Sequence, residues 1–137
     1  MNRLLLVLLS FFFGASIVLA GHYHVAVKGA FTCRDKVYSD VHVELLDYDI
    51  FYADVLLSTV DASKSGKFYI EMSLALIGDR TELVPLIPYV TITDKCRGKP
   101  SCWKFWIPGD YQWMDGNPKK VYHMGTVNLT DPHQETC

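Results

Sequence analysis

The sequence has little charge and no cluster of basic residues. Charged residues make up 20% of its 137 positions, with 13 Lys and Arg against 15 Asp and Glu. Because nucleic-acid binding depends on clustered basic side chains, we expect no nucleic-acid partner. The chain also lacks a second long hydrophobic run after its first 20 residues. A helix that crosses a bilayer needs about 20 apolar residues, so we expect no integral membrane protein.

The first 20 residues have the three parts of a secretory signal peptide. Arg3 is the only Lys, Arg, Asp or Glu before Lys28; an apolar run follows it, and small residues stand near its end. This run is short for a membrane anchor. We therefore expect residues 1–20 to be a signal peptide, with cleavage after Ala20 or Gly21. Residues 21–137 then form one secreted, extracellular domain.

Cysteine is scarce, but all four cysteines lie in the expected mature part: Cys33, Cys96, Cys102 and Cys137. An even number in an oxidising compartment predicts disulfides, with three pairings open. The sequence favours Cys96–Cys102, which closes a short polar loop, and leaves Cys33 with Cys137. A free Cys137 that joins two chains is the alternative. We expect no metal site, because the chain lacks the two close Cys/His pairs of a zinc site.

Apolar residues recur at every second position from residue 25 onward, which is the period of β-strands. Turn residues separate the runs, for example at 63–66, 108–110 and 115–118. Six or seven short strands predict an all-β, two-sheet antiparallel β-sandwich. Residues 74–86 depart from this period and predict one short helix between strands. The alternating runs are 25–31, 41–46, 67–72, 89–93, 103–107 and 121–129.

Five segments cover nearly the whole mature chain in one order: Val27–Cys33; Val41–Leu45; Asp54–Thr59 with Ser65–Phe68; Pro88–Ile92 through Cys96 and Cys102; and Tyr122–Leu129. Together they resemble the nematode-type transthyretin-like family, which implies a transthyretin (prealbumin)-like sandwich. The chain departs from the family's usual residues at Asp94, where histidine is frequent, and at His123, where aspartate is frequent. Residues 74–86 are also more apolar than is usual there.

The resemblance implies a secreted, non-catalytic binding protein without a cofactor. Such a protein carries a small apolar ligand in a groove formed between subunits, or bridges to a cell-surface lipid or receptor. A homo-oligomer is compatible with both roles. The alternative is a hydrolase of the 5-hydroxyisourate type. Those enzymes end in a Tyr-Arg-Gly-Ser type tetrapeptide, which residues 132–137 lack, so we expect no enzymatic activity and no catalytic residues.

All three tryptophans fall within residues 102–114. Because successive strand residues point to opposite faces, a core-facing Trp103, Phe105 and Ile107 would turn Lys104 and Trp106 outward. Large exposed aromatic residues are common anchors of interfaces. The alternative is that Trp106 packs beneath the connection that comes after it. The predicted binding surface consists of Lys104, Trp106, Tyr111 and Trp113.

Two smaller motifs remain near the ends of the mature chain. Asn128-Leu129-Thr130 matches the acceptor pattern for N-glycosylation, which predicts a glycoprotein if the chain is secreted. His22 and His24 suit a Cu(II) site only if cleavage leaves His22 as the first residue. We therefore predict glycosylation at Asn128 and no metal ion.

Overall fold

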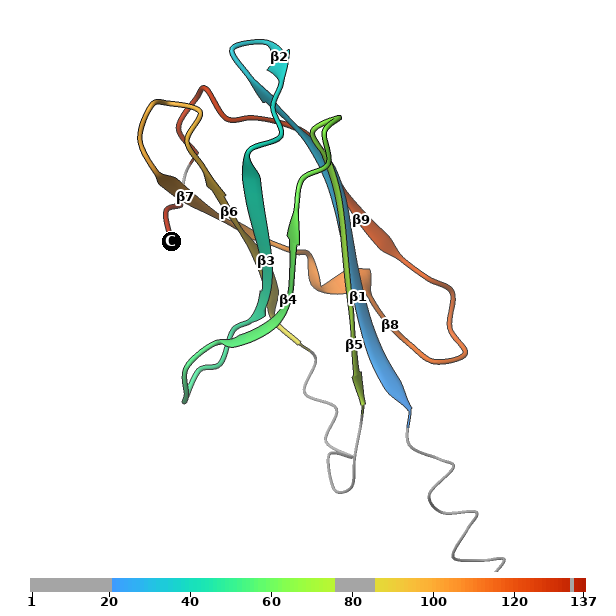
Figure 1. Cartoon of the computed structure of the whole chain (residues 1–137). Coiled ribbons are helices and arrows are strands. Elements are labelled where there is room, and N and C mark those ends of the chain that lie inside the picture. The colour runs from blue at the N-terminus through green and yellow to red at the C-terminus, as the bar shows by residue number, and fades with distance from the viewer. Residues whose placement is uncertain (1–20, 76–85, 134) are drawn as a thin grey trace, which may run out of the picture.

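The computed structural model describes residues 21–75, 86–133 and 135–137, and nearly all of the regular secondary structure in this part belongs to two facing β-sheets (Figure 1). The predicted all-β sandwich is therefore confirmed. The helix expected within residues 74–86 lies almost wholly outside the described residues, as does the expected signal peptide; Leu74 itself belongs to a strand. In the described part the one helix is the short 3-10 turn η1 (Gly109–Tyr111). No described helix is long and apolar enough to cross a bilayer.

Sheet A is built around the long strand β1 (His22–Cys33). It pairs antiparallel with β2 (Lys36–Val37), β5 (Lys67–Ala75) and β8 (Gln112–Met114). It pairs in parallel with β9 (Val121–Asn128). The parallel pairing arises because β8 runs antiparallel to the start of β1, and the chain then reverses before it continues along β1 as β9.

Sheet B has the strand order β4-β3-β6-β7, and its neighbouring strands are all antiparallel. The strands are β3 (Val41–Asp47), β4 (Val55–Asp61), β6 (Pro88–Asp94) and β7 (Ser101–Trp106). Strands β4 and β7 are therefore the edges of this sheet. Edge strand β7 carries Lys104 and Trp106, two of the four residues of the predicted binding surface.

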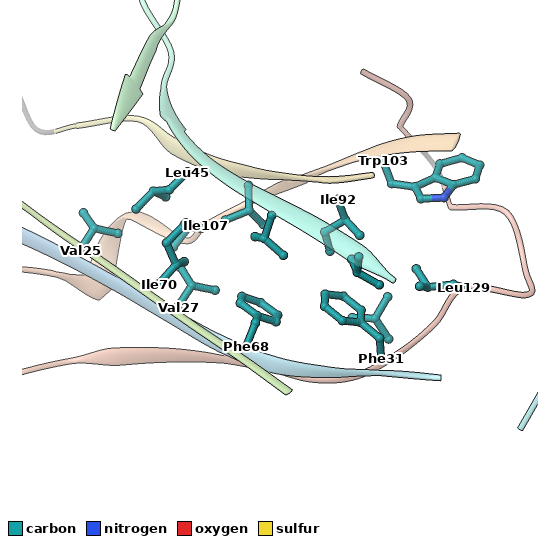
Figure 2. Packing of buried hydrophobic residues seen from close by; sticks show 14 of the residues in the cluster. Val25, Val27, Phe31, Leu45, Phe68, Ile70, Ile92, Trp103, Ile107 and Leu129 are labelled. Carbon is teal, nitrogen blue, oxygen red and sulfur yellow. The ribbon is translucent and has the colours of Figure 1, made fainter. Parts of the chain in front are cut away.

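The core fills the space between the sheets with alternate residues from each strand, as Figure 2 shows. Phe31 and Phe68 stack inside it with ring centroids 5.1 Å apart. Trp103 and Ile107 are buried and Trp106 is exposed, which confirms the predicted faces of β7. Fully buried side chains that anchor the two layers include Val25, Val27, Phe31, Val43, Leu45, Val90, Ile92 and Leu129.

Gly29 of β1 lies close to the Phe68 side chain of β5 and to the backbone of β9. A Cβ atom there would lie 2.9 Å from the Phe68 ring and 3.1 Å from the Gly125 carbonyl oxygen. The register between β1 and β9 shifts between Lys28 and Ala30, on either side of this glycine. A side chain at this position would therefore push the closing strand away from the sheet.

The four cysteines form two disulfides, but the predicted pairing is wrong. Cys33 pairs with Cys96, and Cys102 pairs with Cys137. In the ladder of β6 and β7, Cys102 lies opposite the exposed Thr93. Cys96 instead is buried beyond the end of β6, against the core. The two side chains thus belong to opposite faces of the hairpin, and Cys96 meets the end of β1 in the other sheet.

Candidate functional site

The open side of the sandwich, between edge strands β7 and β9, holds a groove of about 380 Å³. Phe105 of β7 and Tyr122, Met124 and Val127 of β9 form its apolar wall. These four residues also pack against or belong to the hydrophobic core, so the wall is part of the fold. A groove of this volume is near the lower end of the range for small-molecule sites.

Lys104, Trp106 and Glu135 form the polar rim of the groove. The Lys104 ammonium lies 4.4 Å from the Trp106 ring centroid and 3.9 Å from Glu135 Oε1. The Trp106 indole donates a hydrogen bond to Glu135 Oε2 at 2.8 Å. The predicted residues Lys104 and Trp106 are therefore neighbours, and the side-chain carboxylate of Glu135 contacts both.

The C-terminal tail reaches the rim because it pairs with the edge of β7. Thr136 forms a β-bridge with Trp103, and the Lys104 amide donates to the Glu135 carbonyl at 2.9 Å. The Cys102–Cys137 disulfide fixes the end of this tail. In Figure 1 the C-terminus accordingly lies beside β7. The tail thus covers an otherwise open strand edge and supplies one side of the groove.

A hydrogen bond below the rim joins β6 to the residue before β4. The Tyr89 hydroxyl donates to Asp54, and Lys104 lies 4.2 Å from the Tyr89 ring centroid. Burial, together with this carboxylate, raises the pKa of Tyr89 to about 12. The same hydrogen bond lowers the pKa of Asp54. Tyr89 therefore stays neutral and Asp54 stays ionised over the physiological range.

The other two predicted residues do not line this groove. Tyr111 packs on the groove residue Tyr122, with ring centroids 4.9 Å apart. Trp113 is only 8% exposed and stacks on His24 of β1, with ring centroids 5.2 Å apart. The predicted surface is therefore divided between the groove and the outer face of sheet A.

A polar network surrounds Trp113 on that outer face. His24 Nδ1 lies 2.8 Å from the Ser73 hydroxyl, and His24 Nε2 lies 2.6 Å from Asp115 Oδ1. His22 Nδ1 lies 3.0 Å from the other Asp115 oxygen. Serine, histidine and aspartate in this order can act as a nucleophile, a base and an orienting acid. Here Ser73 and Asp115 are exposed to water, whereas acyl transfer depends on a water-excluded site with oxyanion donors.

Within the described part of the chain, no group of three or more His, Cys, Asp or Glu side chains is arranged to hold a metal ion. In particular, His24 already uses both ring nitrogens in the network around Asp115. The groove therefore offers a ligand an apolar wall and, at its rim, the ion pair of Lys104 with Glu135.

Comparison with known proteins agrees with this architecture. The model of the transthyretin-like family (TTR-52) matches residues 28–108, more than half of the chain. The chain belongs to the transthyretin-like family. No curated protein sequence matches it. Among solved structures, a 9R-lipoxygenase from Cyanothece PCC8801 is similar at 13% identity and a TM-score of 0.42 over 81% of this chain. The transthyretin-like chain spans 18% of that lipoxygenase chain.

Two features of this transthyretin-like protein were not predicted from the sequence. The groove wall on β9 was not predicted because Tyr122 and Met124 have the pattern of ordinary strand residues. Only the pairing of β9 with β1 brings them opposite β7. The aromatic run Tyr48-Asp49-Ile50-Phe51-Tyr52 was also missed. Its signal was visible, because apolar residues between two strands are unusual in a turn that is otherwise polar.

Asp94 is only 2% exposed in this transthyretin-like protein. Its Oδ1 accepts a hydrogen bond from the Cys96 amide at 2.9 Å. Burial raises the pKa of Asp94, and the Cys96 amide opposes this only in part. His123, by contrast, is exposed on β9.

We expect Asp94 and Asp115 to titrate on opposite sides of the ordinary value of 3.8. Hydrogen bonds with His24 and, to a smaller extent, with His22 lower the pKa of Asp115. The contribution of Asp115 to stability is therefore present above pH 3.8 and is lost as pH falls through its lower folded pKa. The contribution of Asp94 to stability is present below pH 3.8 and is lost as pH rises through its raised folded pKa. Carbon-13 NMR of the two carboxyl groups measures both values, and the reverse order would contradict the structure.

Proposed function

We propose that this transthyretin-like protein is a secreted, non-catalytic extracellular binding protein that carries a small apolar ligand in the groove between β7 and β9. The observation that carries the proposal is the groove itself, with an apolar wall and a volume of about 380 Å³. Its wall is made of residues packed on the core, so the site is formed before a ligand arrives. Preformed, mostly apolar concavities are the usual sites for small molecules.

The rim defines which end of a ligand faces water. Lys104 and Glu135 form an ion pair, and His133 lies nearby with Nε2 3.0 Å from the Asn128 carbonyl oxygen. A ligand with an apolar body and one polar end fits this division, because charged groups are costly to bury without partners. The groove belongs to a single chain, so ligand binding there does not require a second subunit.

Secretion is supported by two features that agree with one another, and one residue, Asn128, would report on it. The N-terminal sequence has the pattern of a signal peptide. Both disulfides are of the kind that persist in oxidising compartments. Asn128 lies at the end of β9 and is half-buried, with Oδ1 accepting from the Thr130 amide at 3.0 Å. Glycosylation at Asn128 remains a prediction.

A hydrolase is the competing function. The network of Ser73, His24 and Asp115 contains the residue types that such an enzyme uses, but the exposure of Ser73 and Asp115 to water argues against it. Turnover of 5-hydroxyisourate above its spontaneous rate by the purified protein would contradict a non-catalytic function. A bridging role at a cell surface requires a second surface, which the groove alone does not provide.

We expect the purified protein to bind the apolar anionic dye 1-anilinonaphthalene-8-sulfonate in the groove, and Met124→Glu to weaken this binding by about tenfold or more. A carboxylate in the apolar wall would have to be desolvated beside the dye, which is unfavourable. Fluorescence titration measures the dissociation constant. Energy transfer from tryptophan to the bound dye provides a second signal, because Trp106 lines the same groove.

His123→Glu is the matched control for this experiment. His123 neighbours Met124 on β9, but it is exposed and does not line the groove. The same charge at this position should leave dye binding unchanged. Thermal unfolding of both variants shows whether each one is folded, since partly unfolded proteins also bind this dye. Equal loss of binding in two folded variants would show that the dye binds elsewhere.

A further inference from the structure

The loop between β3 and β4, residues 48–54, presents three consecutive apolar side chains to solvent. Ile50 is 69% exposed, Phe51 86% and Tyr52 80%. Figure 1 shows this connection projecting beyond the ends of β3 and β4. An exposed cluster of large apolar side chains is rare on proteins that bind nothing there. None of residues 48–54 lines the groove, although Tyr48 packs against Trp106 at the groove rim, with ring centroids 5.7 Å apart.

Hydrogen bonds hold the loop in one conformation. Asp49 Oδ1 accepts from the amides of Phe51 and Tyr52 at 2.8 and 3.1 Å. The Asp49 amide donates to Asp54 Oδ1 at 3.1 Å, and Tyr89 anchors the other oxygen of Asp54. The apolar tip is therefore presented on a closed turn, and little conformational entropy remains to be lost on binding.

The apolar surface continues from the tip onto the adjoining strands. Val55 and Leu56 at the start of β4 are 50% and 52% exposed, and Ile87 is 46% exposed. The Tyr48 amide donates to the Ile87 carbonyl at 3.0 Å, which places Ile87 next to the loop. Exposed apolar side chains are thus present both at the tip of the loop and at its base.

The charge around this surface is mainly negative, with Lys104 as a basic residue near Asp54. Residues 41–63, which span β3, the loop and β4, contain no Lys or Arg. The acidic residues in this stretch are Glu44, Asp47, Asp49, Asp54 and Asp61. Such a surface is repelled by anionic lipids, whereas aromatic rings and carboxylates both attract quaternary ammonium groups.

We propose that the β3–β4 loop docks the protein reversibly on the interface of zwitterionic, choline-containing lipid bilayers. A protruding apolar tip enters a fluid interface without a matching pocket, whereas a protein partner must offer a concavity of the same shape. Phe51, Ile50 and Tyr52 insert at the headgroup level, where aromatic side chains are favoured. The acidic flanks then face the choline layer, and the turn held by Asp49 keeps the three side chains together.

Flotation with phosphatidylcholine vesicles tests the proposal, using oxidised protein harvested from the medium of cells that express the full chain. Mass spectrometry first establishes that residues 1–20 are absent, because that apolar segment would bind lipid by itself. We expect binding to phosphatidylcholine and weaker binding when part of it is replaced by phosphatidylserine. The double variant Ile50→Ser and Phe51→Ser should lower the partition coefficient by about tenfold or more.

Val37→Ser is the matched control, because Val37 is 65% exposed but lies on β2, away from the loop. It should leave vesicle binding unchanged. Phe51→Trp gives a positive signal, since its fluorescence should shift to the blue on binding and be quenched by brominated acyl chains. Binding only to phosphatidylserine vesicles, or equal loss in Val37→Ser, would overturn the proposal. So would a loop variant that changes a dimer into a monomer while the parent protein ignores phosphatidylcholine, because the loop would then be a contact between copies.

Discussion

Cys33→Ala together with Cys96→Ala is expected to lower the free energy of unfolding by about 4 kcal/mol. The two cysteines are 63 residues apart, and the loss of a cross-link over this distance returns about that much chain entropy to the unfolded state. The bridge also joins the end of β1 in sheet A to the end of β6 in sheet B. Thermal unfolding should show a midpoint lower by roughly 10–20 °C.

The double variant Cys102→Ala and Cys137→Ala is the informative control. Its cysteines are 35 residues apart, so its nominal effect is similar, again about 4 kcal/mol. It releases the tail from β7 instead of parting the sheets, so tail contacts such as Trp106 with Glu135 should be lost first. Peptide mapping of the non-reduced protein checks the pairing directly. A fragment that links Cys96 to Cys102 would refute the structure.

The sandwich and the faces of β7 were predictable because strand periodicity is a local property. Alternation along residues 103–107 suffices to place Trp103 inside and Trp106 outside, and the structure agrees. The disulfide pairing was not predictable in this way. Cys96 and Cys102 are close in sequence, but the register of β6 and β7 and the end of the strand at Asp94 turn them to different faces.

The candidate site was predictable only in part, for the same reason. Lys104 and Trp106 follow from one strand, whereas Glu135, which binds both, arrives by an antiparallel bridge at the end of the chain. Trp113 was expected on a surface beside Trp106. It instead forms a short strand against the start of β1, where His24 covers it. Pairings between distant segments decide these positions, and no local pattern encodes them.

Deletion of residues 2–20 is expected to keep the protein inside the cell with all four cysteines reduced. Without the signal sequence the chain stays in a reducing compartment, where disulfides rarely persist. The two cross-links together contribute about 8 kcal/mol by loop entropy. Because domains of this size are stable by only about 5–15 kcal/mol, a loss of this size removes half or more of the stability, so the reduced protein should be much more sensitive to protease.

Thiol titration and limited proteolysis of the cell extract measure this outcome. Replacing residues 1–20 with an unrelated signal peptide is the control, and it should restore protein in the medium that is resistant to protease and free of thiols. A reduced chain that resists protease inside the cell would mean that packing between the two sheets suffices for folding. Export in spite of the deletion would mean that residues 1–20 are not the signal. Since the first result concerns stability and the second concerns targeting, the experiment separates the two roles that oxidation and export have in this protein.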